Sequence, residues 1–349
     1  MTVTVNTVTV HTDQASRLLQ ALRAATGDPN LHYSGPPRQL SGGFWAELLA
    51  FSLADPPPGW PAELVARIMP EAEVAHKETI VQRAVAAAGF PTPVVRAAGR
   101  DGELERAFMV MDRAAGTHLL SGLSGADAIT SGLTALRDIP RLLAATMARL
   151  HSLDPGPVRD QLGSSCGVPV TVPGMLVALR QMARDYRRAD LAAAAQWLID
   201  NPLPPAPEVI CHGDLHPFNL LVDGGDVCLL DWTAALLAPR VYDVAFTSLL
   251  LAEPPLAVPR ALRPVVRRLG ALLARRFVMR YGQDAGITVD RRELRWHQGV
   301  GCLRALVESA GWTQQGTAEA RAGHPWLVCG PAFARRLTAL TGSRVLSGG

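Results

Sequence analysis

Residues 208–243 read EVICHGDLHPFNLLVDGGDVCLLDWTAALLAPRVYD and alternate short apolar runs with a few ionisable side chains. Val209–Cys211 has the length and composition of a short strand, as do the runs Asn219–Val222 and Val227–Trp232. Asp223-Gly224-Gly225 separates the last two runs and is typical of a tight hairpin turn, in which glycine adopts positive φ. We therefore expect one short strand followed by an antiparallel hairpin.

Three oxygen-bearing side chains converge in this arrangement. Asn219 and Asp231 fall at the open end of the hairpin, and Asp214 lies on the loop that leads into it. Carboxylate and amide oxygens are the ligands that magnesium prefers. An Asp five residues before an Asn is also similar to the catalytic loop of protein kinases, where the Asp accepts a proton and the Asn holds a metal ion.

The motif HGDLHPFN at 212–219, followed by LLDW at 229–232, resembles the aminoglycoside phosphotransferase family, kinase-like enzymes that phosphorylate small molecules. The resemblance implies an α+β, two-lobed, protein-kinase-like fold that uses ATP and Mg²⁺ and accepts a small-molecule hydroxyl. It assigns the catalytic base to Asp214, the magnesium ligands to Asn219 and Asp231, and support of the catalytic loop to His212 and Asp243.

Two other interpretations apply to this stretch. Asp223 and Asp226 lie in the turn itself, where Asp is favoured, and are expected to be solvated. His212, Asp214 and His216 could instead open the two-metal site of a metallophosphoesterase. That site needs further ligand motifs, and the sequence has no Gly-Asn-His and no second closely spaced histidine pair.

Composition excludes several classes of protein. The 349 residues are 48% hydrophobic and 19% charged, with a net charge of +3, which favours a large core and does not suggest nucleic-acid binding. The five cysteines form no Cys-x-x-Cys pair, so neither a zinc site nor a disulfide framework is expected. No signal peptide is recognisable, and no stretch reaches the roughly 18 uncharged apolar residues of a membrane-spanning helix. The sequence predicts a cytoplasmic protein without a membrane partner.

The N-terminal third predicts an antiparallel sheet with a helix across it. An amphipathic helix is expected at Asp13–Thr26, and the crossing helix at Val74–Ala88, where Gly89 and Pro91 end it. The expected strands are two within Arg38–Leu53, one at Glu63–Met69, and a hairpin formed by Val94–Ala98 and Arg106–Met111.

Ser41, Gly42 and Gly43 form the turn between the first two strands. A glycine turn lets backbone N–H groups approach phosphate oxygens, so these residues are candidates for nucleotide binding. A plain hairpin turn is the alternative. The sequence contains no Gly-Lys-Ser/Thr, which excludes a Walker A loop.

Arg67 interrupts an otherwise apolar strand, because period-two alternation places it on one face with Val65 and Met69. The resemblance places a basic residue here to hold the nucleotide phosphates and a helix Glu, Glu78, to orient it. Protein kinases and many relatives have lysine at this position, whereas the sole lysine of this chain, Lys77, is expected to be solvated. Arginine keeps the charge and binds phosphate, so ATP binding is expected; a purely structural salt bridge is the alternative.

Met111, Asp112 and Arg113 resemble the hinge between the lobes of a kinase, whose backbone can bind adenine. The division follows from this resemblance: residues 1–112 form the nucleotide-binding lobe, and residues 113–349 form the helical lobe with the catalytic loop and the acceptor site.

The rest of the chain is predicted to be helical, at Ile139–Leu153, Pro173–Asn201, Val244–Ala252, Val265–Tyr281, Arg291–Gly311 and Pro331–Leu340. His151 is expected in the core rather than in catalysis, and Trp296, His297, Trp312 and Trp326 are expected to fill core rather than to floor an acceptor pocket. From Leu251 onward the sequence has fifteen arginines and only six acidic residues. This excess of positive charge disfavours a polycationic acceptor.

The sequence therefore predicts transfer of the γ-phosphoryl group of ATP to a hydroxyl of an antibiotic or metabolite. A nucleotide-binding pseudokinase without catalysis is the main alternative, because of the arginine at position 67. The motifs do not distinguish aminoglycosides, macrolides, sugars and amino alcohols as acceptors, or ATP from GTP.

Overall fold

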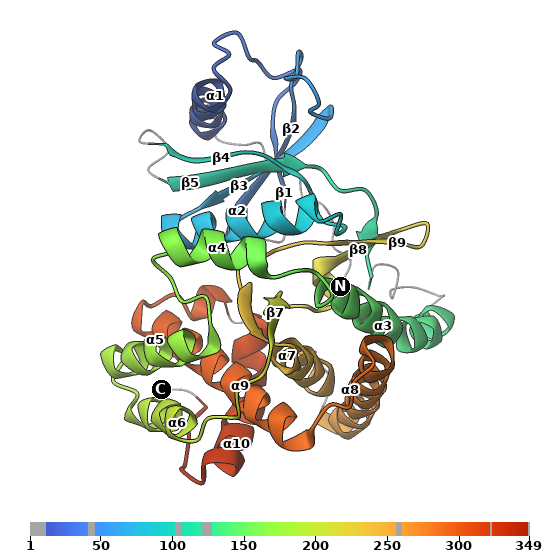
Figure 1. The fold of residues 1–349 in the computed structure, drawn as a ribbon, viewed down its shortest axis with the longest axis vertical. Coiled ribbons are helices and arrows are strands. Elements are labelled where there is room, and N and C mark those ends of the chain that lie inside the picture. The colour runs from blue at the N-terminus through green and yellow to red at the C-terminus, as the bar shows by residue number, and fades with distance from the viewer. Residues whose placement is uncertain are drawn as a thin grey trace. The chain divides into compact units, whose positions relative to one another are not determined.

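The computed structural model describes residues 12–40, 46–101, 106–119, 128–255, 260–321 and 323–347 (Figure 1). The chain divides into two compact units. The first comprises Met1–Ser131, Gly156–Val168 and Phe218–Ala235, and the second comprises Gly132–Pro155, Pro169–Pro217 and Leu236–Gly349. The assignment of nucleotide binding to residues 1–112 and of acceptor binding to residues 113–349 remains a prediction about function.

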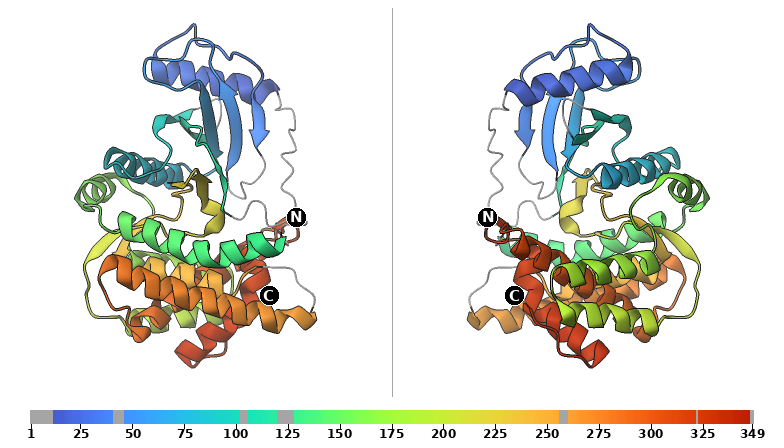
Figure 2. Two further views of the ribbon diagram at one scale, coloured as in Figure 1. Left: turned by 90° about the vertical axis from the view of Figure 1, so that its right-hand side faces the viewer. Right: turned by 90° about the vertical axis from the view of Figure 1, so that its left-hand side faces the viewer.

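The first unit contains a five-stranded antiparallel sheet in the order β1-β2-β3-β5-β4, as the sequence predicts. Its strands are β1 (Arg38–Leu40), β2 (Glu47–Ser52), β3 (Glu63–Met69), β4 (Val95–Asp101) and β5 (Arg106–Asp112). Two helices, α1 (Thr12–Thr26) and α2 (Ala72–Ala87), cover opposite faces of this sheet (Figure 2).

Alternation along β3 decides which side chains each helix covers. Leu64 and Ile68 pack with Leu18 and Leu22 of α1, whereas Met69 packs with residues of α2 on the other face. Successive residues of a strand point to opposite faces, so Arg67 shares the α2 face with Met69. The helix expected across the sheet is thus present, and α1 adds a second layer to the unit.

A second sheet in the first unit carries the predicted hairpin. Its strands are β6 (Thr117–His118), β8 (Leu220–Asp223) and β9 (Asp226–Leu229), in the order β6-β8-β9. Gly224 and Gly225 have φ of +55° and +110°, the left-handed values that the turn requires. The sequence predicted a strand at Val227–Trp232 that includes Asp231. Instead β9 ends at Leu229, and Asp231 lies in the loop that follows the hairpin.

Helix α4 (Gly156–Ser165) was not foreseen, and it packs against α2 within the first unit. Lys77 of α2 is only 8% exposed, so the prediction that it is solvated is wrong. A helix face that the sequence assigns to the surface can be buried by another element that packs on it. The local spacing of residues does not reveal that element.

The second unit is mainly helical, which completes an α+β fold. Its helices are most of α3 (Ala128–Leu150), α5 (Val172–Asp185), α6 (Ala189–Asp200), α7 (Val241–Ala252), α8 (Arg263–Ala285), α9 (Arg291–Gln314) and α10 (Pro325–Thr341). A two-stranded antiparallel ribbon pairs β7 (Glu208–Cys211) with β10 (Leu236–Pro239). Single 3₁₀ turns occupy Pro217–Asn219, Arg260–Leu262 and Glu319–Arg321.

Helix α10 begins six residues before the start expected at Pro331. His324 caps it by accepting from the backbone N–H of Trp326 at 3.3 Å, and Pro325 follows in the first turn. Proline is favoured in the first turn of a helix, where its missing N–H costs nothing. Pro325 therefore starts α10, and Pro331 is accommodated inside it.

The core of the second unit is built around the aromatic side chains of α9 and α10. Trp296, Trp312 and Trp326 are all buried and belong to one cluster with residues of α5, α6 and α7. His297 is 3% exposed and lies edge-on to Trp296 at 4.9 Å between ring centroids. The prediction that these residues fill core is confirmed.

His297 is a polar side chain in the apolar core of the second unit. Neither ring nitrogen has a hydrogen-bond partner among the described residues. Burial lowers its pKa to about 4.

The substitution His297→Phe is expected to flatten the decline of stability in acid. The unfolded chain binds the proton near pH 6.5 and the folded chain only near pH 4, so the free energy of unfolding falls across that range by up to about 3 kcal/mol. Phenylalanine keeps a ring in place and takes up no proton. Urea unfolding at pH 7 and pH 4.5 measures the difference, with His32→Phe at an exposed position as the control. Equal pH dependence in the wild type and His297→Phe would contradict the prediction.

No helix in the described part of the chain combines the length and the apolar character needed to cross a bilayer.

Candidate active site

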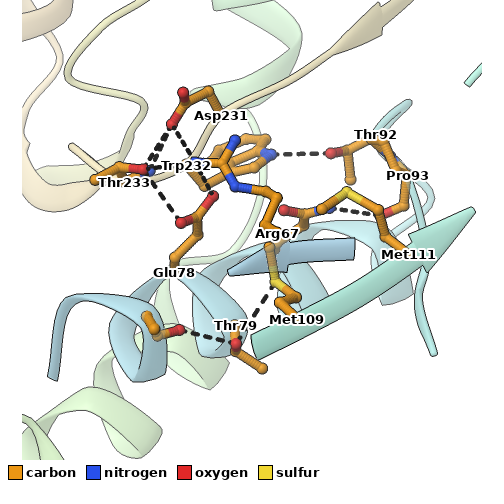
Figure 3. A network of polar contacts seen from close by, with 12 residues as sticks. Arg67, Glu78, Thr79, Thr92, Pro93, Met109, Met111, Asp231, Trp232 and Thr233 are labelled. Atoms are coloured by element: carbon orange, nitrogen blue, oxygen red, sulfur yellow. Dashed lines mark hydrogen bonds and ion pairs between the residues drawn. The ribbon is translucent and has the colours of Figure 1, made fainter. Parts of the chain in front are cut away.

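Arg67 lies on β3 and is 8% exposed. Figure 3 shows its guanidinium directed at Glu78 of α2 and at Asp231 and Thr233, which follow β9. Its Nη2 lies 3.3 Å from Glu78 Oε1 and 3.2 Å from Asp231 Oδ1, and it donates to Thr233 Oγ1 at 3.1 Å. Three charged residues that are distant in sequence therefore meet in the first unit. The two carboxylates supply the negative charge that a buried arginine needs.

Asp231 is held in an uncommon backbone conformation with φ of +64°. Left-handed backbone is unfavourable for most residues with a side chain, although Asp and Asn tolerate it better than others. Thr233 stabilises this turn, since its hydroxyl lies 2.6 Å from Asp231 Oδ1 and its backbone N–H donates to the same oxygen at 3.3 Å. The turn presents the Asp231 carboxylate to Arg67.

Thr233 was missed by the sequence analysis. Its hydroxyl also lies 3.1 Å from Glu78 Oε2 and so joins both carboxylates. The available signal was a hydroxyl residue two positions after Asp231, the spacing at which an Asp side chain caps a turn.

Two of the three charged groups in this network, Arg67 and Glu78, are buried, whereas the side chain of Asp231 is 38% exposed. Burial raises the pKa of the Glu78 carboxyl and the charge of Asp231 adds to that effect, while Arg67 opposes it. Burial alone would lower the pKa of Arg67, but Asp231 and Glu78 raise it above its ordinary value. Arg67 is consequently charged throughout the accessible pH range.

The substitution Arg67→Ala is expected to reduce the free energy of unfolding by about 3 kcal/mol, because it leaves Glu78 buried without its counter-charge. Urea denaturation followed by tryptophan fluorescence measures the effect. The control is Arg113→Ala, which removes an exposed ion pair with Glu63 at 3.4 Å and should cost less than about 1 kcal/mol. Equal effects of the two substitutions would contradict the description of Arg67 and Glu78 as a buried ion pair.

The hairpin that carries the predicted metal ligands is anchored within the first unit. The N–H of Leu230 donates to the carbonyl of Asn219 at 2.9 Å, so Asn219 lies across the hairpin beside the start of the Asp231 loop. Trp232 Nε1 donates to Thr92 Oγ1, and that hydroxyl donates to the carbonyl of Leu229, both at 2.9 Å. One amide and one carboxylate at the same hairpin end form a donor set that fits Mg²⁺.

The predicted hinge residues are engaged in the sheet. Met111 is buried, and Asp112 receives two hydrogen bonds from Arg96 at 2.6 and 2.7 Å. The N–H of Asp112 donates to Val94 and the N–H of Arg113 to Glu63. These two N–H groups are therefore not available to adenine in this conformation.

Arg113 also lines a small polar cavity of about 140 Å³ together with Arg38 and Glu63. Ser41, Gly42 and Gly43, the predicted phosphate-binding turn, lie outside the described residues.

In the second unit, Asp243 of α7 holds the loop that contains Asp214. Its Oδ2 and Oδ1 accept from the backbone N–H groups of His212 and Gly213, each at 2.7 Å. His212 Nδ1 in turn accepts from the N–H of Asp214 at 3.2 Å. Asp243 and His212 are both buried, and together they order the backbone on either side of Gly213, whose φ is +75°.

His151 contacts Asp243 through its ring. Its Nε2 lies 3.2 Å from Asp243 Oδ2 and its Nδ1 lies 2.7 Å from Tyr281 Oη. Cys211 completes the cluster, with Sγ 3.9 Å from His151 Nε2, and burial raises the pKa of its thiol far above the usual value. His151, Cys211 and Asp243 have the ligand types of a metal site, yet each is accounted for by hydrogen bonds and a protonated thiol. The prediction that His151 is a core residue is confirmed.

Arg304 of α9 supports the same loop and was also missed. Its Nη1 donates to the carbonyl of Gly213 at 2.9 Å, and its Nε lies 3.2 Å from Glu308 Oε1. Its guanidinium lies over the rings of Phe246 and Trp326, 5.5 and 4.9 Å from their centroids. A helical Arg and Glu four residues apart within an apolar stretch were the available signal.

Within the first unit the structure brings together Arg67, Glu78 and Asp231, with Asn219 on the same hairpin. Within the second it brings together His212, Asp214 and Asp243. The roles that the resemblance assigns to these residues remain predictions.

This fold is that of the kinase-like phosphotransferases. The model of the family described as "Phosphotransferase enzyme family" matches residues 38–297, which is most of the chain. The protein therefore belongs to that family, and the family resemblance and the kinase-like fold class predicted from the sequence are confirmed. No curated protein matches the chain in sequence.

Solved structures with the same fold span almost the whole chain. A protein of Ralstonia eutropha JMP134, provisionally described as an aminoglycoside phosphotransferase, has a TM-score of 0.63 at 19% identity over 93% of this chain and 98% of its own. A thermostable mutant of the aminoglycoside phosphotransferase APH(4)-Ia, in a ternary complex with AMP-PNP and hygromycin B, has a TM-score of 0.57 at 21% identity over 92% and 99%. A choline/ethanolamine kinase family protein of Mesorhizobium loti has a TM-score of 0.52 at 17% identity over 95% and 100%. At these identities the comparison concerns the fold.

Proposed function

We propose that this protein transfers the γ-phosphoryl group of ATP to a hydroxyl group of a small molecule, with Mg²⁺, in the cytoplasm. The observation that carries the proposal is the buried contact of Arg67 with Glu78 and Asp231. In a kinase-like fold this is where a cation meets the nucleotide phosphates and a carboxylate meets the metal ion. Support for ATP as donor comes from the related fold that binds AMP-PNP.

Each side chain would have a defined task. Arg67, oriented by Glu78, would bind phosphate oxygens as a planar fork of donors, where many relatives use a lysine. Asn219 and Asp231 would hold Mg²⁺, which neutralises phosphate charge when bound. Asp214 would accept the proton of the acceptor hydroxyl as the new bond to phosphorus forms.

The loop around Asp214 is suited to that task because it is fixed from two sides. Asp243 accepts from the two N–H groups that precede Asp214, and Arg304 donates to the carbonyl of Gly213. A base whose backbone is fixed in this way loses little freedom when the acceptor binds, which lowers the barrier to proton transfer.

The charges around this loop do not favour a polycationic acceptor. Arg304 lies beside Gly213, and Arg321 lies over the ring of Trp312 at 4.9 Å. Burial raises the pKa of the Glu308 carboxyl, and this carboxyl also interacts electrostatically with Asp214 and Arg321, so these groups share one neighbourhood. The guanidinium groups of Arg304 and Arg321 offset the carboxyl groups of Glu308 and Asp214, so this neighbourhood lacks the excess negative charge that a polycationic acceptor would need.

A screen of ATP consumption tests the proposal. ADP release would be measured with Mg²⁺ and ATP against hygromycin B, a macrolide, a neutral sugar, an amino alcohol and a hydroxy acid. Turnover with a neutral or anionic alcohol is expected, and hygromycin B should be a poor acceptor.

Other outcomes separate the alternatives. Efficient turnover of hygromycin B would contradict the predicted preference for neutral or anionic acceptors, but it would still support phosphoryl transfer. Magnesium-dependent ATP binding without transfer to any alcohol would indicate a pseudokinase. Hydrolysis of p-nitrophenyl phosphate with a transition metal and without ATP would indicate a phosphoesterase.

A further inference from the structure

Helix α8 and the turn before it expose a row of large apolar side chains. Half of the ten exposed large apolar residues of the described chain lie here. They are Leu262, Val265, Leu269, Leu272 and Met279, exposed by 52, 60, 38, 43 and 62%. We refer to these five residues as the α8 seam.

The seam follows the spacing of a coiled coil. Its members and Arg276 recur at alternating steps of three and four residues, which places them on one narrow stripe of the helix. A stripe this narrow is typical of the contact surface between two helices. A sheet or a flat surface would be matched better by a broader apolar face.

The opposite side of α8 is fixed in the unit. Gly270, Ala274, Phe277 and Tyr281 are buried, and α7 packs against this side. Gly270 allows a very close approach, because a Cβ there would lie 2.5 Å from the carbonyl oxygen of Leu251. The seam is therefore held outward by a helix that cannot easily rotate.

Arginines border the seam, and their charge is largely uncompensated. Arg268 directly precedes Leu269 of the seam. Arg276 lies on the same stripe between Leu272 and Met279, and Arg275 directly precedes it. Arg280 pairs with Asp284 at 2.9 Å, but no acidic group of the described residues forms an ion pair with Arg268, Arg275 or Arg276. A partner that carries carboxylates next to an apolar stripe would complement this surface.

Three occupants can be compared by charge and shape. A second copy of α8 would set arginine against arginine, which costs energy at close range. An anionic bilayer would suit the arginines at the border, but Arg276 lies within the stripe and would be carried into the apolar layer. An amphipathic helix with acidic residues beside its own apolar stripe satisfies both the seam and Arg276. Residues 1–11 contain no Asp or Glu and do not supply that charge.

We propose that the α8 seam is a docking surface for an acidic amphipathic helix of another protein. The seam would supply apolar side chains to a short two-helix contact, and Arg268, Arg275 and Arg276 would pair with carboxylates of the partner. This surface uses no residue assigned to phosphoryl transfer, so the proposal stands apart from the proposed function.

The test uses the full-length protein and two fluorescein-labelled synthetic peptides, measured by fluorescence anisotropy. Both peptides have leucines at heptad positions a and d; one has glutamates at the flanking positions and the other has lysines. The acidic peptide is expected to bind, and the lysine peptide is not. The double substitutions Leu269→Gln/Leu272→Gln and Arg268→Gln/Arg275→Gln should each weaken binding at least about tenfold.

The matched control is Val177→Gln, at an apolar residue of α5 that is 50% exposed, which should leave binding unchanged. All of these positions are exposed, and thermal unfolding by circular dichroism checks that the variants remain folded. The proposal is overturned if the acidic peptide does not bind, or if the seam variants bind it as well as the wild type does.

Two parallel measurements distinguish the other occupants. Sedimentation with phosphatidylcholine vesicles, with and without phosphatidylglycerol, tests the bilayer, and light scattering after size exclusion tests a dimer. Seam-dependent binding to anionic vesicles with no peptide binding would assign the surface to a membrane. A dimer abolished by Leu269→Gln/Leu272→Gln would assign it to a second copy, and either result refutes the acidic helix.

Discussion

Replacing Asp214 by alanine is expected to reduce phosphoryl transfer by about a hundredfold to ten-thousandfold, because a positioned general base contributes roughly 10² to 10⁴ in rate. Asp214 is the carboxylate on the loop that Asp243 and Arg304 hold in place. The loop contacts of its neighbours use backbone groups, so the alanine variant should remain folded. The measurement is kcat for ADP release with whichever acceptor the screen identifies.

The controls separate chemistry from binding and folding. Asp214→Ala should bind ATP as the wild type does, because its proposed task concerns the acceptor alone. Asp223→Ala, in the exposed hairpin turn, should leave kcat unchanged. Retention of wild-type turnover in Asp214→Ala would refute its role as the base.

The second large effect is expected at Asp231. The substitution Asp231→Asn should lower kcat at least about a hundredfold and raise the magnesium concentration needed for half-maximal activity, since one charged ligand of a hard cation is lost. Asparagine is the informative replacement, because it keeps the shape of the side chain and tolerates the φ of +64° at this position. Activity measured as a function of Mg²⁺ concentration gives both quantities.

Asp226→Asn serves as the matched control, because it makes the same chemical change at an exposed residue of the same hairpin. It should alter neither kcat nor the magnesium requirement. If Asp231→Asn changed stability but kept the magnesium dependence of the wild type, Asp231 would be a partner of Arg67 and not a metal ligand.

Much of the local structure near the site could be predicted from the sequence. The strand Glu63–Met69 is predicted correctly because its alternation has a period of two, and the same alternation places Arg67 on a buried face. The hairpin turn is predicted because Gly224 and Gly225 suit positive φ. Such features depend on neighbours within a few residues, which a single sequence displays.

Two predictions about helices were wrong for different reasons. Lys77 was expected in solvent but is buried, on a helix against which α4 packs. The start of α10 was placed at Pro331 instead of Pro325, because the capping by His324 and the first-turn role of Pro325 were not recognised. The backbone conformation of Asp231 was not foreseen either, because it depends on the hydrogen bonds of Thr233 and on Arg67.

The sequence by itself determined the class of this protein, through the motif at 212–219 and the hairpin that follows, because those residues act at fixed local spacing. Only the tertiary structure decided that Arg67 binds Asp231, 164 residues away, and that Arg304 holds the carbonyl of Gly213, 91 residues away. Contacts at such separations depend on how strands and helices pack, and packing depends on the summed burial of many side chains. The spacing of nearby residues in the sequence does not give that summed burial.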